Sequence, residues 1–405
     1  MNIIRNSEET GIYVHFPYCI QKCSYCDFYS VGLDQTTGGK EPPVSAFLEF
    51  RDSVQTEFRK RIQNFATKKV RSVYFGGGTS SLLPPEIVAG LIEQFKKEMD
   101  FKTDCEITLE GNPENFTSAY LSALKDAGVN RINAGLQTFN RSSLEAMNRY
   151  FDPERYASIL RDLTSCEIKN TGGDLIYGFP GQTEEEFFAD LQAAAASGIS
   201  HLSVYSLTVE ENTPYAKQAR TGERKIPDED LQRHIFEILP GHLLPFGFKM
   251  YEISNYSRGG RDCRHNLGYW LYEPYMGLGP GAHGFDGSFR WANPRNIAQY
   301  QRDPASTGKE KEDLAWDMPL GLFRITEPIQ PQWLYEIFSE RGINPDRLLA
   351  LEKLLAAFVE EGSGIRTGPS KGGTFQWTMA GLLMLDNHIL RISEAIEQDL
   401  QVQAV

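Results

Sequence analysis

The alternation of short apolar runs with amphipathic segments in the first half of the chain constrains its fold most strongly. The segments between the runs carry apolar residues at helical spacing and are bounded by turn residues. Strands separated by helices pair in parallel through right-handed crossovers. Six such units within about 200 residues predict an α/β fold, a partial (βα)6 TIM-like barrel with its helices outside. The predicted strands are Gly11–His15, Ser72–Phe75, Glu106–Glu110, Arg131–Gln137, Gly173–Tyr177 and His201–Leu207.

The remainder of the chain is less regular and divides into two further sections. A chain of 405 residues has room for two or three domains at roughly 150 residues each. The regularity fades after Leu207, so we expect the barrel to occupy residues 1–212 and a post-barrel region to occupy 213–312. Residues 313–405 combine amphipathic helices with a glycine-rich stretch and a short strand, which predicts a small α+β module.

Composition and charge restrict the functional class. Apolar residues make up 40% of the chain and charged residues 23%, and no apolar run reaches the roughly 18 residues of a membrane span. The amino terminus lacks the basic start and apolar stretch of a secretory signal, so we expect a soluble, cytoplasmic protein with reduced thiols. The net charge is −13, from 41 basic and 54 acidic residues, which argues against a nucleic-acid partner.

Three of the six cysteines, Cys19, Cys23 and Cys26, follow the first predicted strand with C-x3-C-x2-C spacing. Structural zinc usually takes four protein ligands, and no fourth Cys or His lies at ordinary finger spacing. A [4Fe–4S] cluster held by three cysteines leaves one iron open to a small molecule with N and O donors. Three incidental buried thiols are the alternative. The spacing favours a cluster at the carboxyl ends of the strands, where Gly76–Gly78 and Asn112 also lie.

Several motifs make the chain similar to the radical S-adenosylmethionine (SAM) superfamily. They are Tyr13-Val-His-Phe-Pro-Tyr-Cys19 through Cys26, Gly76-Gly-Gly-Thr79, Glu110-Gly-Asn-Pro113, Arg131 through Gln137, Arg149 and Asp174 through Thr183. The resemblance implies that the open iron binds SAM and that an electron cleaves it to methionine and a 5′-deoxyadenosyl radical. Taken singly, the carboxylates could be helix caps, the arginine a surface ion pair and the glycines a turn. The SAM-binding residues that the resemblance implies are Tyr13, Gly77, Gly78, Thr79, Glu110, Gln137, Arg149 and Asp174.

Two differences from HemN-type proteins make the chain more similar to the HemW side of the HemN/HemW branch. HemN-type proteins carry a fourth cysteine two residues after the third, where this chain has Phe28, and only 18 residues precede Cys19. The resemblance implies a haem chaperone that binds haem and passes it to acceptor haemoproteins. It also implies a winged-helix-like HemN carboxy-terminal domain. An oxygen-independent coproporphyrinogen III dehydrogenase is the alternative, so enzymatic activity is undecided and we assign no catalytic residue.

The segment His265-Asn-Leu-Gly-Tyr-Trp270 is similar to the HNxxYW motif of the same branch. A neutral imidazole can ligate haem iron, so His265 is the candidate haem contact. The alternative is a buried structural histidine in an aromatic cluster. Peripheral membrane contact and oligomeric state stay open.

A G-x-G-x-x-G pattern at Gly279–Gly284 is expected not to bind a dinucleotide. Glu273 and Pro274 stand in the preceding segment, where that fingerprint requires a buried strand.

Overall fold

All six predicted strands are present and pair in parallel in the predicted order. The computed structural model describes residues 8–33, 42–65, 69–149, 152–306, 308, 310–311, 314–340, 348–368 and 373–401. Within this part, four strands extend the predicted runs by up to six residues at one end, β6 matches its run, and β8 ends one residue earlier than predicted. They are β1 (Glu9–Phe16), β4 (Lys69–Gly77), β5 (Asp100–Gly111), β6 (Arg131–Gln137), β7 (Asn170–Tyr177) and β8 (His201–Ser206). The expected partial parallel barrel is therefore confirmed.

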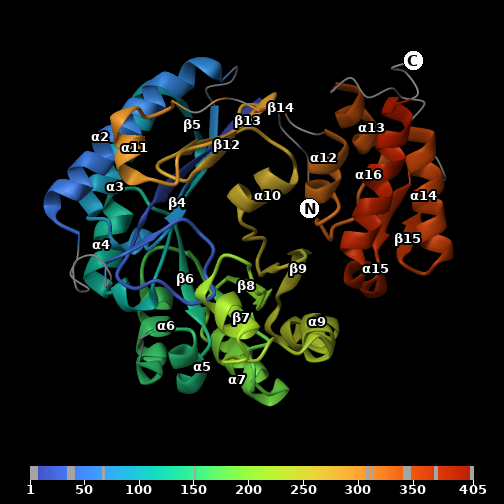
Figure 1. Cartoon of the computed structure of the whole chain (residues 1–405), viewed down its shortest axis with the longest axis horizontal. Coiled ribbons are helices and arrows are strands. Elements are labelled where there is room, and N and C mark those ends of the chain that lie inside the picture. The colour runs from blue at the N-terminus through green and yellow to red at the C-terminus, as the bar shows by residue number, and fades with distance from the viewer. Residues whose placement is uncertain are drawn as a thin grey trace.

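Helices cover the outer face of these strands (Figure 1). Local capping fixes several of their starts. At α7, the Thr183 hydroxyl accepts from the Glu186 amide and the Glu186 carboxylate accepts from the Thr183 amide, a capping box that contributes about 1 kcal/mol. The outer helices are α2 (Val44–Arg61), α3 (Pro85–Glu98), α4 (Ser118–Asp126), α5 (Arg141–Ala146), α6 (Tyr156–Ser165), α7 (Glu184–Ala196) and α9 (Glu229–Leu243). The short helix α8 (Pro214–Arg220) lies beside the cysteine loop, where the amide of Tyr215 donates to the carbonyl of Ser24 (2.9 Å).

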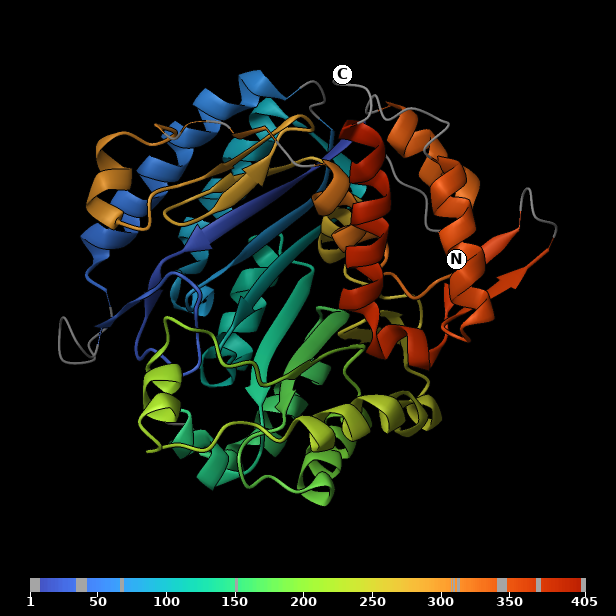
Figure 2. The ribbon, with the colours of Figure 1, turned by 45° about the vertical axis from the view of Figure 1, so that its right-hand side comes forward.

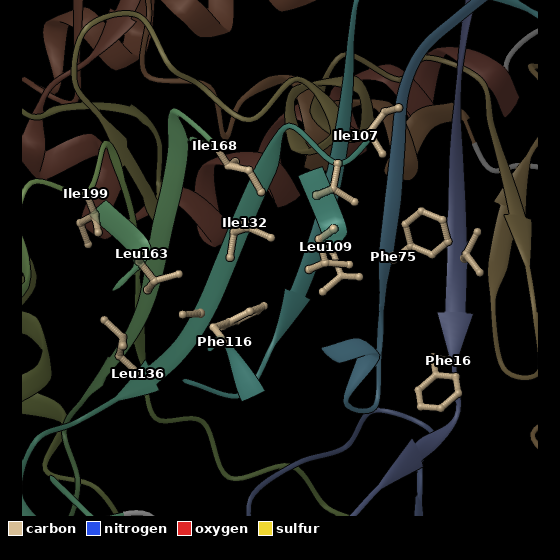
Figure 3. Close-up of a cluster of buried hydrophobic side chains, with 14 of the residues drawn as sticks. Phe16, Phe75, Ile107, Leu109, Phe116, Ile132, Leu136, Leu163, Ile168 and Ile199 are labelled. Carbon is tan, nitrogen blue, oxygen red and sulfur yellow. The ribbon is translucent and has the colours of Figure 1, made fainter. Parts of the chain in front are cut away.

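The main core fills the space between strands and helices. Alternate residues of each strand point outward into it, among them Phe75, Leu109 and Ile132, which are fully or almost fully buried (Figure 3). Burying each such side chain stabilises the fold by about 1.5–3 kcal/mol. The opposite residues of the same strands therefore face the inside of the barrel.

The section 213–312 is continuous with the barrel, because its strands join the same sheet. They are β9 (Lys249–Glu252), β10 (Asn255–Ser257), β11 (Tyr275–Leu278), β12 (His283–Phe285) and β13 (Phe289–Ala292), with β14 (Glu310–Lys311) at the edge. The sheet order is β14-β13-β12-β11-β1-β4-β5-β6-β7-β8-β10-β9. The buried strand β11 pairs in parallel with β1 and directly precedes Gly279, so the expectation of no strand before the glycine pattern was wrong. The pattern leads into β12 and not into a helix.

The carboxy-terminal part forms the expected small α+β module beside the barrel (Figure 2). It contains α12 (Leu314–Leu322), α13 (Pro331–Glu340), α14 (Leu348–Glu360), the hairpin of β15 (Gly364–Thr367) and β16 (Thr374–Trp377), α15 (Met379–Leu383) and α16 (Leu385–Gln401). Its own hydrophobic core includes Phe358 and Trp377 and extends to Tyr275 and Phe285 of the sheet. The boundary expected between residues 312 and 313 lies outside the described residues.

Candidate functional site

The three clustered cysteines lie on one loop that hydrogen bonds fasten to the barrel rim. The carbonyl of Tyr18, just after β1, accepts from the amide of Thr79, just after β4 (2.8 Å), and the amide of Ser24 donates to the carbonyl of Met147 (3.0 Å). The side chain of Asn148 donates to the carbonyl of Lys22 (3.1 Å). The loop is therefore fixed at the carboxyl ends of the strands, where the sequence placed it.

The donor set suits an iron–sulfur cluster. Cys19, Cys23 and Cys26 are partly buried free thiols, and all three line one cavity of about 870 Å³. Burial raises the pKa of Cys19 and raises that of Cys26 to about 11, so ligation of iron requires loss of these thiol protons. No three His, Cys, Asp or Glu side chains of the described residues close around a single ion position. A cubane cluster binds each of its three cysteines through a different iron, so it does not require such closure.

The cavity also gathers most of the residues that the sequence nominated for SAM. It lies inside the barrel and reaches from the cysteine loop across β4 to β8. Seven of the eight candidates line it: Gly77, Gly78, Thr79, Glu110, Gln137, Arg149 and Asp174. The eighth, Tyr13, is not among the described residues that line the cavity. Its hydroxyl hydrogen bonds Nδ1 of His15 (3.0 Å) behind the wall.

The glycine loop and Glu110 form one hydrogen-bonded unit. Gly77 has φ = +108°, a conformation that favours glycine, and its amide donates to Oε1 of Glu110 (2.9 Å). A Cβ on Gly77 would meet the His15 ring at 2.8 Å, and one on Gly78 would meet the Tyr18 carbonyl at 2.6 Å. Packing within the chain therefore requires glycine at both positions. A ligand that approaches this loop closely would require it as well.

Three further candidates carry complementary groups, two on the neighbouring strands β6 and β7 and one, Arg149, in the loop after α5. Arg149 donates through Nη2 to the carbonyl of Gly135 (2.6 Å), and Asp174 accepts from Nδ2 of Asn133 (2.7 and 2.8 Å). Gln137 ends β6 with φ = +64°, a strained backbone of the kind that concentrates at functional sites. Together they offer donors and acceptors suited to a zwitterion and a ribose.

Sequence reasoning missed a set of polar residues on the same inner face. They follow strand periodicity, since every second residue of a strand faces the same side. The residues between them, such as Ile132 and Leu136, belong to the outer core. The missed lining residues are Tyr74, Thr108, Arg131, Asn133, His201, Ser203 and Tyr205. The alternation of polar and apolar residues in Arg131–Gln137 and His201–Ser206 is the signal that could have found them.

His265 lies on the short helix α10 (Arg264–Trp270), outside the cavity lining of the described residues. Its side chain is buried, and both ring nitrogens have partners: Nδ1 with the Ser72 hydroxyl (3.0 Å) and Nε2 with the Tyr269 hydroxyl (2.8 Å). In this arrangement neither nitrogen is open to a haem iron. This geometry argues against the predicted contact between His265 and haem iron.

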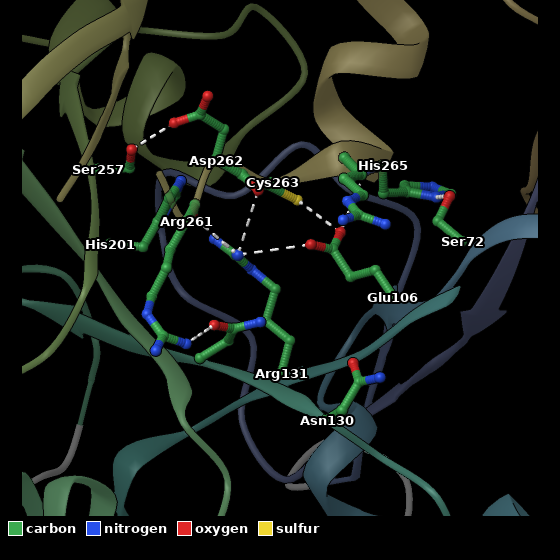
Figure 4. Close-up of polar contacts among 12 residues, drawn as sticks. Ser72, Glu106, Asn130, Arg131, His201, Ser257, Arg261, Asp262, Cys263 and His265 are labelled. Atoms are coloured by element: carbon green, nitrogen blue, oxygen red, sulfur yellow. Dashed lines mark hydrogen bonds and ion pairs between the residues drawn. The ribbon is translucent and has the colours of Figure 1, made fainter. Parts of the chain in front are cut away.

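A polar network links the start of α10 to β5 and β6 (Figure 4), and two of its members, Arg131 and Cys263, line the cavity. Oε1 of Glu106 accepts from the backbone amide of His265 (3.1 Å) and from the thiol of Cys263 (3.5 Å), while Oε2 lies 3.4 Å from Nη1 of Arg131. Burial raises the pKa of Cys263 far above its ordinary value, so this thiol stays protonated. The network is a structural connection between β5, β6 and α10.

Comparison with known proteins decides the family. The radical SAM superfamily model matches residues 13–194. The heme chaperone HemW of Mycobacterium tuberculosis is 34% identical over 290 residues, 72% of this chain and 73% of that one. The heme chaperone HemW of Haemophilus influenzae is 35% identical over 276 residues, 68% of this chain and 70% of that one. The chain belongs to the HemW family. The expected resemblance to radical SAM proteins of the HemN/HemW branch is thereby confirmed.

The fold of this HemW family member extends to a solved relative. Coproporphyrinogen III oxidase (HemN) from Escherichia coli superimposes with a TM-score of 0.74, covering 96% of this chain and 90% of that one at 21% identity. This similarity shows the shared fold, which includes the carboxy-terminal module. The radical SAM superfamily implies a [4Fe–4S] cluster and SAM. Among the described helices, none has both the length and the apolar character needed to cross a bilayer.

Proposed function

We propose that this protein is a haem chaperone that binds haem, a [4Fe–4S] cluster and SAM, and transfers haem to acceptor haemoproteins. The observation that carries the proposal is the match to proteins named heme chaperone HemW over about seven-tenths of both chains. The cysteine loop supports it, because Phe28 stands where HemN-type proteins carry a fourth cysteine, and Phe28 is 70% exposed at the cavity.

In this proposal, the residues of the cavity have separate tasks. Cys19, Cys23 and Cys26 hold the cluster, which when bound supplies an open iron and an electron-transfer centre. Glu110 accepts from the ammonium group of SAM, and Arg149 faces its carboxylate. Gly77, Gly78, Thr79 and Gln137 shape the site around methionine, and Asp174 accepts from the ribose hydroxyls. Tyr13 does not line the cavity and acts indirectly, through the hydrogen bond between its hydroxyl and Nδ1 of His15.

The decisive experiment is anaerobic reconstitution with iron and sulfide, followed by a haem titration and a coproporphyrinogen III turnover assay with SAM and reductant. We expect a saturable Soret absorbance change and no protoporphyrinogen. Mixing the haem-loaded protein with an apo-haemoprotein should then transfer the Soret signal to the acceptor. Conversion at enzyme-like rates without stable haem binding would replace the proposal with the dehydrogenase alternative.

The affinity for SAM is expected to depend on pH through Glu110. Burial raises the pKa of this carboxyl to about 7, and the nearby Asp174 adds to the effect. The ammonium group of SAM binds the ionised carboxylate better, so affinity should fall as the pH drops through about 7. Isothermal titration of SAM between pH values of about 6 and 8 measures this dependence.

Glu110→Gln is the matched variant for this prediction, because it keeps the size of the side chain and removes its titration. We expect the variant to bind SAM at least about tenfold more weakly, the effect of losing one charge-assisted hydrogen bond. Its affinity should also lose the step near neutral pH. An unchanged step in the variant would assign the pH dependence to another group.

A further inference from the structure

The His265 side chain is buried among aromatic rings and hydrogen-bonded at both nitrogens, as is typical of a structural histidine. The imidazole stacks on the ring of Tyr74 (centroids 5.0 Å apart, 26° between planes) and lies edge-on to Tyr269 (4.9 Å, 80°). The Tyr13 ring lies 6.2 Å away on a third side. Burial lowers the pKa of His265 well below its ordinary value. A neutral imidazole has one N–H donor and one acceptor nitrogen, and the hydroxyls of Ser72 and Tyr269 match both.

The Tyr74 ring that stacks on His265 connects it to the SAM site. The Tyr74 hydroxyl donates to Oε2 of Glu110 (2.7 Å), and Oε1 of Glu110 accepts from the amide of Gly77 (2.9 Å). The path therefore runs from α10 through one aromatic stack and two hydrogen bonds to the glycine loop. Both Tyr74 and Glu110 line the cavity.

The base of this path is firmly held. Glu106 accepts from the backbone amide of His265 and is itself paired with the buried guanidinium of Arg131 (Figure 4). The close approach of α10 to β4 also requires small neighbours. A Cβ on Gly268 of α10 would meet Nη2 of Arg71, a residue of β4, at 2.1 Å, and a Cβ on Gly11 of β1 would meet the same atom at 3.2 Å. The imidazole therefore has a fixed position under Tyr74.

We propose that His265 is a positioning residue of the SAM site, which orients Glu110 through Tyr74, and that it does not ligate haem iron. The inference rests on the proposed SAM site and assigns the His-Asn-x-x-Tyr-Trp segment to support of that site. Haem ligation then falls to other groups of the protein.

The test compares SAM and haem binding in His265→Ala and Tyr74→Phe, each reconstituted with its cluster. His265→Ala removes the stack, and Tyr74→Phe removes the hydroxyl that holds Glu110. Each change should weaken SAM binding about five- to tenfold, as expected when one charge-assisted hydrogen bond is weakened. The double variant should lose little more than either single variant, because the two residues act on the same carboxylate. Haem affinity and the Soret maximum should stay as in the wild type.

The pH profile of SAM binding gives a readout that a general loss of structure would not produce. The hydrogen bond from Tyr74 lowers the pKa of Glu110. Its loss should therefore move the midpoint of the profile to higher pH in both single variants. His234→Ala is the control, since it removes a half-exposed imidazole on α9 and should leave the profile unchanged.

His265→Phe keeps the test decisive if the alanine variant does not fold. Phenylalanine retains a flat ring against Tyr74 but has no nitrogen for iron, so it should bind haem normally and lose less SAM affinity than alanine. A lost or shifted Soret band in His265→Phe would overturn the proposal, as would unchanged SAM binding in His265→Ala. If the wild type itself binds no haem or no SAM, the proposed function fails before any variant is compared.

Discussion

Alanine at any one of Cys19, Cys23 or Cys26 is expected to abolish the [4Fe–4S] cluster. Each thiol comes from the same short loop and lines the same cavity. The other described cysteine that lines it, Cys263, donates its proton to Glu106, and burial raises its pKa, so it is a poor substitute ligand. In the proposed site, three thiolates are the only protein ligands of the cluster, so the loss of one would leave a second iron without a protein ligand. Iron and acid-labile sulfide after anaerobic reconstitution should fall to near background, together with the cluster absorbance.

The matched control is Cys166→Ala, which removes a half-buried thiol outside the cavity. It should retain full iron and sulfide. Haem binding should survive in the three cluster variants, because the thiols are assigned to the cluster and not to haem. A full complement of iron and sulfide in Cys23→Ala would refute the three-cysteine site. Loss of haem binding along with the cluster would show that haem binding depends on the cluster site.

The part of the sheet that carries the site could be predicted from the sequence, because long buried strands have a strong apolar signal. Arg131–Gln137 was placed at both ends as the structure has it. The strands that continue the sheet on either side of these six, β9 to β14, were not predicted because they have only two to four residues each. At β11 the misleading residue was Glu273, whose carboxylate lies 3.0 Å from Nε of the buried Arg71. That partner is about two hundred positions away in the chain, so local pattern could not reveal why an acidic residue stands beside a strand.

The residues of the candidate site also fall into those that the sequence could place and those that it could not. Residues at the ends of parallel strands, such as Glu110 and Gln137, meet in the cavity because the topology alone brings those ends together. Tyr13 and His265 do not line it, because a motif states which residue is present but not which way it points. The orientation of His265 depends on Ser72, which lies 193 residues earlier. Long-range packing of this kind is available only from the structure.

Glu57→Ala is expected to cause the largest loss of stability outside the site. This carboxylate on α2 is fully buried and accepts four hydrogen bonds, one from its own helix and three from residues between Gly279 and Tyr300. The donors are Nε of Arg61 (2.5 Å), the Tyr300 hydroxyl (2.7 Å), Nδ2 of Asn293 (2.8 Å) and the amide of Gly279 (2.9 Å). Removing it takes the negative charge away from a buried guanidinium, which costs about 3–5 kcal/mol of the free energy of unfolding.

The same carboxylate links the outer helix to the cysteine loop, so its loss should also reach the site. Gly279 packs so closely on β1 that a Cβ there would meet the carbonyl oxygen of His15 at 2.4 Å, and Nε2 of His15 lies 2.8 Å from the carbonyl oxygen of Tyr29. Urea unfolding measures the loss of stability, and Asp52→Ala is the control. It removes an exposed carboxylate from the same helix, whose ion pair with Arg51 should contribute less than about 1 kcal/mol. Equal unfolding midpoints for Glu57→Ala and Asp52→Ala would show that the four hydrogen bonds do not stabilise the barrel. A lowered midpoint with poorer cluster retention in Glu57→Ala alone would show that packing behind β1 holds the cysteine loop in place.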